Sequence, residues 1–129
     1  MSYFVQTLNR HIIEQERLYP EATGAFTALL TDIALAGKII SYYVNKAGLA
    51  DILGKAGDMN IHGESQEKLD VFANRTMVRA LVHGGQLCAL ASEESEGIIP
   101  IPSDYPIGRS ICCFDPLDGS SNIEANVSI

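Results

Sequence analysis

The sequence predicts an α/β protein in which helices and a mixed sheet form layers. Three observations support this fold class. The chain has 129 residues, 47% of them hydrophobic, which is enough to bury the core of one domain. Up to His83, apolar residues recur at the spacing of amphipathic helices. After Gly84 and Gly85 the pattern changes to short apolar runs, which are typical of buried strands.

Three segments have helical periodicity. The first extends from Thr7 to Tyr19 and stops before Pro20, because proline disfavours a helical residue ahead of it. The second extends from Gly24 to Ala47, with Gly48 in the position of a helix-terminating glycine. The third extends from Lys68 to His83. These segments are expected to form the helical layer.

Residues 54–67 lie between the second and third predicted helices. They are polar and contain three glycines, so the sequence predicts a mobile loop here. The predicted strands come later in the chain and are short. They cover residues 86–92, 98–101 and 110–114, and an apolar pattern over 123–129 predicts the start of a fourth.

Two predicted strands lead into acidic pairs, Glu93 with Glu94 and Asp115 with Asp118. Strand ends in α/β sheets are common ligand sites, and two adjacent ends would gather four carboxylates. These would repel one another unless cations lie between them. Hard oxygen ligands select Mg²⁺, Mn²⁺ or Ca²⁺. Taken alone, the Glu-Glu pair is better interpreted as a solvated turn.

The string DPLDGSS at 115–121 favours the ligand-binding interpretation. Pro116 would hold the backbone so that the two aspartates converge, and Gly119 would leave the backbone open beside Ser120 and Ser121. The N–H and hydroxyl donors of these serines suit a phosphate group next to a metal. Such an arrangement of acids, metal and phosphate performs phosphoryl transfer to water.

Charge and composition argue against other classes. Nine basic and 16 acidic residues give a net charge of −7, which disfavours nucleic-acid binding through phosphate contacts. No apolar run approaches the length of a membrane span, and the N-terminus lacks the features of a secretory signal. Of the three cysteines, the adjacent Cys112 and Cys113 would form only a strained bridge, which predicts reduced thiols in a cytoplasmic protein.

The string FDPLDGSSN at 114–122 resembles the signature of class I fructose-1,6-bisphosphatase, a member of the Mg²⁺-dependent, lithium-sensitive sugar and inositol phosphatases. Similar segments occur in the family's order at 22–30 (ATGAFTALL), 68–74 (KLDVFAN) and 92–94 (SEE), so the resemblance covers almost the whole chain. It implies that residues 1–129 form an N-terminal domain, incomplete at its C-terminus. A further metal ligand and the sugar-specificity residues would lie beyond Ile129.

The resemblance implies roles at matching positions. Metal ligands would be Glu93, Asp115, Asp118 and the backbone carbonyl of Leu117, with Glu64 of the mobile loop assisting. Asp118, Gly119, Ser120 and Ser121 would hold the substrate phosphate, and Asp70 and Glu94 would orient and deprotonate the attacking water. The structural alternatives are an exposed loop acid for Glu64 and a first-turn helix acid for Asp70.

The resemblance also implies an inhibitory AMP site, matched by Thr23, Gly24, Thr27 and Arg109. Two departures weaken the match, because Ala25 replaces a commonly acidic residue and Arg109-Ser110 replaces a Lys-Tyr pair. The alternative for Thr23 and Gly24 is a simple helix cap.

The expected activity is Mg²⁺- or Mn²⁺-dependent hydrolysis of the 1-phosphate of fructose 1,6-bisphosphate, with more than one ion per site. It belongs to gluconeogenesis or, in a plastid relative, to the Calvin cycle. The resemblance further implies a cytoplasmic, allosteric homotetramer. Alternatives are a sedoheptulose-type or inositol-type phosphatase, or a non-catalytic fragment that binds metal or AMP. A protein ending at Ile129 is expected to be a poor catalyst with an exposed strand edge.

Overall fold

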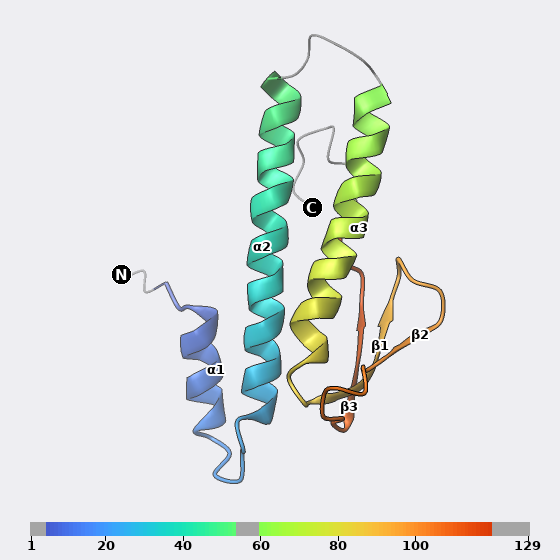
Figure 1. The fold of residues 1–129 in the computed structure, drawn as a ribbon. Helices are drawn as coiled ribbons and strands as arrows, with labels where there is room; N and C mark the ends of the chain where they lie inside the picture. The colour runs from blue at the N-terminus through green and yellow to red at the C-terminus, as the bar shows by residue number, and fades with distance from the viewer. Residues whose placement is uncertain (1–4, 54–59, 120–129) are drawn as a thin grey trace.

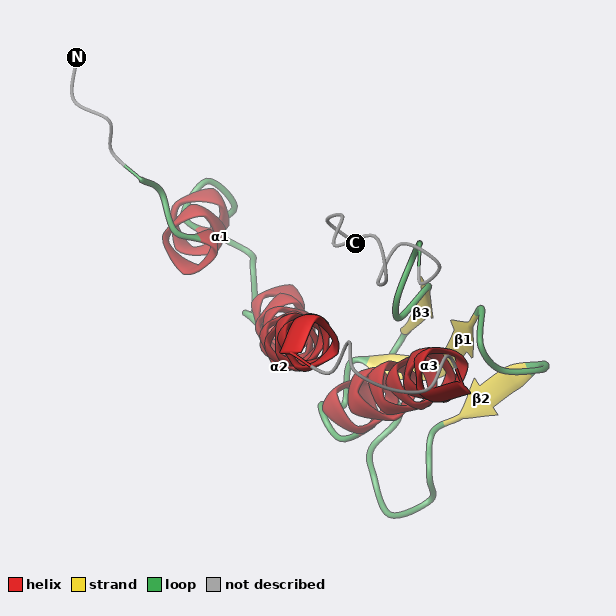
Figure 2. Ribbon diagram, turned by 90° about the horizontal axis from the view of Figure 1, so that it is seen from above, coloured by secondary structure: helices red, strands yellow, loops and turns green. Residues whose placement is uncertain are grey.

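The computed structural model describes the backbone of residues 5–53 and 60–119 and the side chains of residues 5–46 and 69–119. In these parts three helices precede a three-stranded sheet (Figure 1). The elements are α1 (Leu8–Glu16), α2 (Ala25–Leu53), α3 (Asn60–Val82), β1 (Leu87–Ser92), β2 (Ile98–Pro100) and β3 (Ser110–Phe114). Figure 2 shows α2 between α1 and α3, with the strands on the α3 side. The predicted α/β class is confirmed.

The predicted end of α2 is wrong. The helix continues through Gly48 to Leu53, which makes it 29 residues long. A single glycine costs about 1 kcal/mol inside a helix, so it ends a helix only where the chain also turns. Gly85 does mark such a turn after α3, since its φ is 79° and lies in the left-handed region that favours glycine.

The predicted loop over residues 54–67 is wrong for its second half. Helix α3 already begins at Asn60, so residues 60–67 are helical, while residues 54–59 lie outside the described part of the chain. The polar, glycine-containing composition suggested a loop. Glutamate and glutamine are nevertheless good helix formers, and they make up much of this stretch. The predicted strand over 123–129 also lies outside the described residues.

Helix α2 is more apolar than the sequence pattern suggested. Its segment Ala25–Lys46 has a mean hydropathy of 1.3 and is long and apolar enough, by length and composition alone, to cross a membrane. The expectation that no run approaches this length is therefore wrong. Asp32 and Lys38 interrupt the run, but its mean hydropathy stays high enough for a membrane span. Only 17% of this window is buried in the described part of the chain, where Leu29 and Ala36 of α2 belong to the core that α2 shares with α3.

The sheet is mixed and has the order β2-β1-β3. The central strand β1 pairs antiparallel with β2, where Leu90 lies opposite Ile99. It pairs parallel with β3, where Leu90 lies opposite Cys112 and Ser92 opposite Phe114. The parallel pairing places the carboxyl ends of β1 and β3 at the same edge of the sheet.

The core lies between the two long helices and the sheet. Its largest fully buried side chains are Leu81 of α3 and Leu87 and Leu90 of β1. The rings of Tyr43 and Phe72 contact each other across α2 and α3, with their centroids 4.6 Å apart. The central strand and α3 are therefore held rigidly together, which fixes the helix relative to the end of β1.

The three cysteines are free, as predicted. Cys112 and Cys113 occupy neighbouring positions of β3, so their side chains point to opposite faces of the sheet. Partial burial raises the pKa of the Cys112 thiol, and the neighbouring Cys113 raises it further. A thiol with a raised pKa is poorly nucleophilic, so Cys112 is not suited to chemistry.

Candidate active site

The carboxyl ends of β1 and β3 lie side by side. Beyond the last paired residues, Ser92 and Phe114, the backbone N–H of Glu93 donates a hydrogen bond of 3.1 Å to the carbonyl of Phe114. The first acid after β1 is thus tied to the residue that precedes Asp115. Two acidic turns that are about twenty residues apart in the chain therefore share one edge of the sheet.

The turn after β3 holds Asp115 in a defined orientation. The backbone N–H of Leu117 donates to Oδ1 of Asp115 at 3.2 Å, the local bond of an Asx-turn. Pro116 and Leu117 are buried, whereas Asp115 and Asp118 are exposed. Gly119 follows with a φ of 71°, which favours glycine. The buried dipeptide anchors the turn and leaves its acidic groups accessible.

The neighbouring acids raise the pKa of Glu93 above its ordinary value of 4.5. The largest cause is a hydrogen bond with the Glu94 side chain, followed by the charges of Glu94 and Asp115, by partial desolvation and by the charge of Asp118. Glu94, Asp115 and Asp118 are therefore each close enough to affect the carboxyl group of Glu93. A divalent cation at this edge would relieve the repulsion, and protons would compete with it as the pH falls through the pKa of Glu93.

The donor chemistry of this edge fits a hard divalent cation, since four carboxylates supply oxygen ligands and negative charge. Among the residues with described side chains, no group of three or more acidic, histidine or cysteine side chains is close enough to hold a metal. Three predicted site residues lie outside those side chains, namely Glu64, Ser120 and Ser121. Leu117, whose backbone carbonyl is a predicted metal ligand, lies in the turn after β3.

Asp70, a predicted catalytic residue, lies on helix α3. Its side chain is half-buried, and its Oδ1 atom is buried. One helical turn later, Asn74 connects α3 to the end of β1, because the Ser92 hydroxyl donates to Asn74 Oδ1 at 2.6 Å. Sequence reasoning missed Asn74 and Ser92. The available signal was a polar residue four positions after Asp70, on a helix face that also carries the buried Ala73 and Met77.

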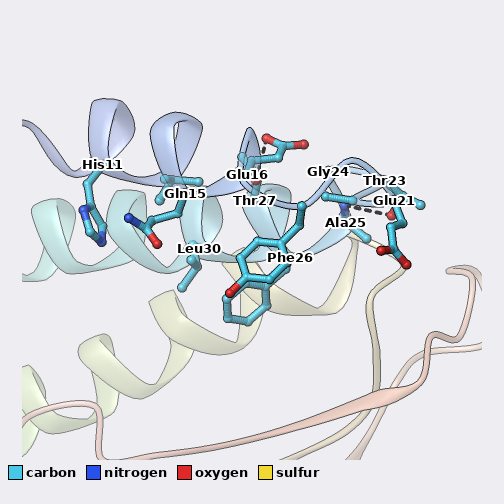
Figure 3. Close-up of a pocket in the computed structure, with 13 residues that line it drawn as sticks. His11, Gln15, Glu16, Glu21, Thr23, Gly24, Ala25, Phe26, Thr27 and Leu30 are labelled. Atoms are coloured by element: carbon cyan, nitrogen blue, oxygen red, sulfur yellow. Dashed lines mark hydrogen bonds between the residues drawn. The ribbon is translucent and has the colours of Figure 1, made fainter.

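A separate pocket of about 570 Å³ lies between α1 and the start of α2 (Figure 3). Thr23, Gly24 and Thr27 line it, as do His11 and Phe26. The structure thus brings together three of the four residues that match the AMP site. It also supports the cap interpretation, because the backbone N–H of Ala25 lies 3.5 Å from the Thr23 hydroxyl oxygen, which accepts it.

Thr27 is positioned by the helix that precedes it. Its hydroxyl donates to Oε2 of Glu16, at the end of α1, at 3.1 Å (Figure 3). Gly24 has a φ of 81° at the start of α2, and its carbonyl accepts a hydrogen bond from the Ala28 N–H at 3.0 Å. The two helices therefore form the pocket as a connected unit.

Arg109 lies beside this pocket rather than in it. It lines a neighbouring hollow of about 420 Å³ together with Ala25 and Phe26, which belong to both hollows. The chain before Arg109 is held against β1, because Gly108 donates to the Leu87 carbonyl at 2.9 Å and leaves no space for a Cβ atom next to the Gln86 backbone. The arginine therefore approaches the start of α2 from the sheet.

The family model for the N-terminal domain of fructose-1-6-bisphosphatase matches residues 6–129. The chain belongs to the fructose-1,6-bisphosphatase family. This confirms the resemblance that four separate sequence segments indicated. The roles of individual residues at the edge of the sheet stay predictions.

Comparison with class 1 fructose-1,6-bisphosphatases shows how much of a family member this chain covers. Those of Maridesulfovibrio salexigens and Chloroherpeton thalassium are both 50% identical over 123 residues, which cover 95% of this chain and 36% and 35% of those proteins. The crystal structure of Leishmania major fructose-1,6-bisphosphatase in holo form is 36% identical, with a TM-score of 0.75 over 96% of this chain and 35% of that one. The T-state structure of the same enzyme gives 35% identity and a TM-score of 0.72. The chain spans about a third of the length of these bisphosphatases.

Proposed function

We propose that the protein hydrolyses the 1-phosphate of fructose 1,6-bisphosphate to fructose 6-phosphate and inorganic phosphate, in the cytoplasm and as a step of sugar synthesis. One observation carries the proposal. In a chain of the bisphosphatase family, the parallel ends of β1 and β3 bring two acidic turns to one edge, where the Glu93 N–H donates to the carbonyl of Phe114, the residue before Asp115. Such an edge suits a metal-dependent phosphatase.

Glu93, Asp115 and Asp118 would hold Mg²⁺ or Mn²⁺, together with the carbonyl of Leu117 and, from α3, Glu64. When bound, divalent cations would neutralise phosphate charge and lower the pKa of a nearby water. The Asx-turn supports this assignment, because it orients Asp115 before any ligand arrives and so lowers the entropic cost of binding. More than one ion per site is consistent with four carboxylates.

Asp70 and Glu94 would orient the attacking water and accept its proton. The water oxygen forms a bond to phosphorus, the bond between phosphorus and the C1 oxygen of the sugar breaks, and that oxygen is protonated from solvent. The backbone of Asp118 and Gly119, with Ser120 and Ser121, would hold the phosphate oxygens. Gly119 supports this role, because glycine has no side chain to cover the backbone and adopts the observed φ of 71° without strain.

The proposal extends to a homo-oligomer. Large apolar side chains of α2 are exposed, and Leu35 at 55% and Tyr42 at 62%, seven residues apart, share one face of the helix. Exposed apolar surface of this kind is typical of subunit contacts. A second subunit covering this face would also account for the high hydropathy of Ala25–Lys46.

The test is phosphate release by the protein at its natural length, assayed with Mg²⁺ present, removed by a chelator, and added back in excess. We expect release from fructose 1,6-bisphosphate that a chelator abolishes and Mg²⁺ restores. Sedoheptulose 1,7-bisphosphate and inositol monophosphate serve as competing substrates. Faster release from either one would assign the sugar specificity to that alternative, and no release from any of the three would contradict the phosphatase proposal.

We also propose that the pocket between α1 and α2 binds AMP as an inhibitor. Its lining by Thr23, Gly24 and Thr27 supports the assignment, as does Arg109 in the adjoining hollow, which could pair with a phosphate. Because Ala25 and Ser110 depart from the family pattern, the backbone of the α2 N-terminus and the Thr27 hydroxyl would supply most of the phosphate contacts.

Changing Thr27 to Val is expected to weaken AMP inhibition about tenfold, which is the effect of losing one hydrogen bond to a charged ligand. Inhibition is measured as the AMP concentration that halves phosphate release, relative to each variant's own rate without AMP. Thr31→Val is the matched control, since its hydroxyl bonds to the Thr27 carbonyl at 2.8 Å and it does not line the pocket. Equal AMP sensitivity of both variants would contradict the assignment.

A further inference from the structure

A small hydrogen-bond network joins helix α3 to the turn after β1. The Ser92 hydroxyl donates to Asn74 Oδ1 at 2.6 Å, and the Asn74 amide in turn donates to the Ser95 hydroxyl at 3.1 Å. The backbone N–H of Glu94 lies 3.3 Å from the Ser92 oxygen, to which it donates. The Asn74 side chain thus accepts a hydrogen bond through Oδ1 and donates one through Nδ2, and the Ser92 hydroxyl both donates and accepts.

This network lies between two proposed catalytic groups. Asp70 is one helical turn before Asn74 on α3, so the two side chains leave the same face of the helix. Glu94 is two residues after Ser92, and its own backbone is a member of the network. A chain of three hydrogen-bonded groups therefore leads from the helix that carries Asp70 to the backbone of Glu94.

The network reaches into the core at the end of β1. Ser92 is the only buried polar residue among the described side chains, at 8% exposure. Asn74 lies next to Ala73 and three residues before Met77, both buried. An apolar pair would pack at this place without requiring exact partners, whereas a polar pair with Ser92 buried and Asn74 half-buried needs its hydrogen-bond geometry to be kept. The polar pair therefore fixes the helix and the turn in a single relative position.

We propose that Asn74 and Ser92 are positioning residues, which hold Glu94 at the correct place relative to Asp70 for the two carboxylates to act on one water. The inference rests on the proposed phosphatase function. Each would act through the backbone of Glu94, which is hydrogen-bonded to Ser92, and not through contact with substrate. Misplacement of a catalytic group by about 1 Å can reduce a rate about a hundredfold, and loss of outer partners at metal sites costs about 10–100-fold.

The test uses the protein at its natural length, with fructose 1,6-bisphosphate and Mg²⁺. Ser92→Ala and Asn74→Leu are expected to lower kcat about 10–100-fold, with KM for the substrate changed less than about threefold. Ser92→Thr keeps the hydroxyl and is expected to recover most of the rate. Ser103→Ala is the control, because it removes an exposed serine hydroxyl from the loop before β3 and lies away from the acidic edge.

A double-mutant cycle separates positioning from general stability. If Ser92 acts through Glu94, adding Ser92→Ala to Glu94→Gln is expected to lower kcat by less than about twofold more. Full additivity of the two changes would overturn the inference, as would a Ser92→Ala variant with the parent's kcat. Thermal unfolding of each variant shows that the rates refer to folded protein. A parent without metal-dependent phosphate release would overturn the proposed function and this inference together, whereas an active parent with additive effects overturns the inference alone.

Discussion

Changing Asp118 to Asn is expected to reduce the rate of phosphate release from fructose 1,6-bisphosphate about a thousandfold. Asp118 is one of the exposed acids whose charge reaches Glu93, and it follows the buried, anchored dipeptide at 116–117. The amide keeps the shape of the side chain but removes its negative charge. A bound cation that stabilises the transition state contributes several kcal/mol, and about 4 kcal/mol corresponds to a factor of about 1000.

The measurement is the initial rate at saturating substrate, as a function of Mg²⁺ concentration, in the protein at its natural length. Asp104→Asn is the matched control, because Asp104 is an exposed acid in the loop between β2 and β3, at the opposite edge of the sheet. We expect the control to retain the parent's rate. A normal rate for the Asp118→Asn variant would count against the proposed site, since the other acids would then suffice.

Changing Leu90 to Ala is expected to lower the free energy of unfolding by about 2–5 kcal/mol. Leu90 is 0% exposed, at the middle of the central strand, with Ile99 on one side and Cys112 on the other. The change removes apolar contacts with the helices and leaves a cavity that rigid neighbours cannot fill. The acidic edge would lose its support, because β1 carries one of its two turns.

The change is measured by chemical unfolding with urea, followed by circular dichroism, with the midpoint and slope compared between variants. Leu18→Ala is the control, because the same atoms are removed from a side chain that is 67% exposed. Surface changes of this kind alter stability by about 0.5 kcal/mol or less. Equal losses at both positions would show that the core does not lie where the structure places it.

Much of the fold could be predicted from local patterns. The strand over Ser110–Phe114 has the predicted bounds, and β1 and β2 differ from the predicted strands by only one residue at an end. These strands are short apolar runs between turn residues, which is a local signal. The long helix α2 was recognised from its periodicity, but its end at Leu53 was not. Whether a glycine such as Gly48 ends a helix depends on what the following residues pack against, and this is not a local property.

The candidate site could likewise be predicted only where its residues are close together in the chain. The acidic pairs and the string DPLDGSS are visible in the chain, because a turn that binds phosphate and metal needs particular residues next to one another. Asn74 and Ser92 were not visible in this way. They are 18 positions apart and meet only because α3 packs on β1, so their contact could not be predicted, although both lie in segments that resemble the family.

The sequence by itself determined the family, the fold class and the residue types that could bind metal and phosphate, since each depends on residues close together in the chain. The tertiary structure alone decided that β1 and β3 pair in parallel and thereby bring Glu93 and Asp115 to one edge. It also decided that α1 and α2 enclose a pocket and that Asn74 joins α3 to the end of β1. These features depend on contacts between distant segments, and the burial of a shared apolar core determines which distant segments meet.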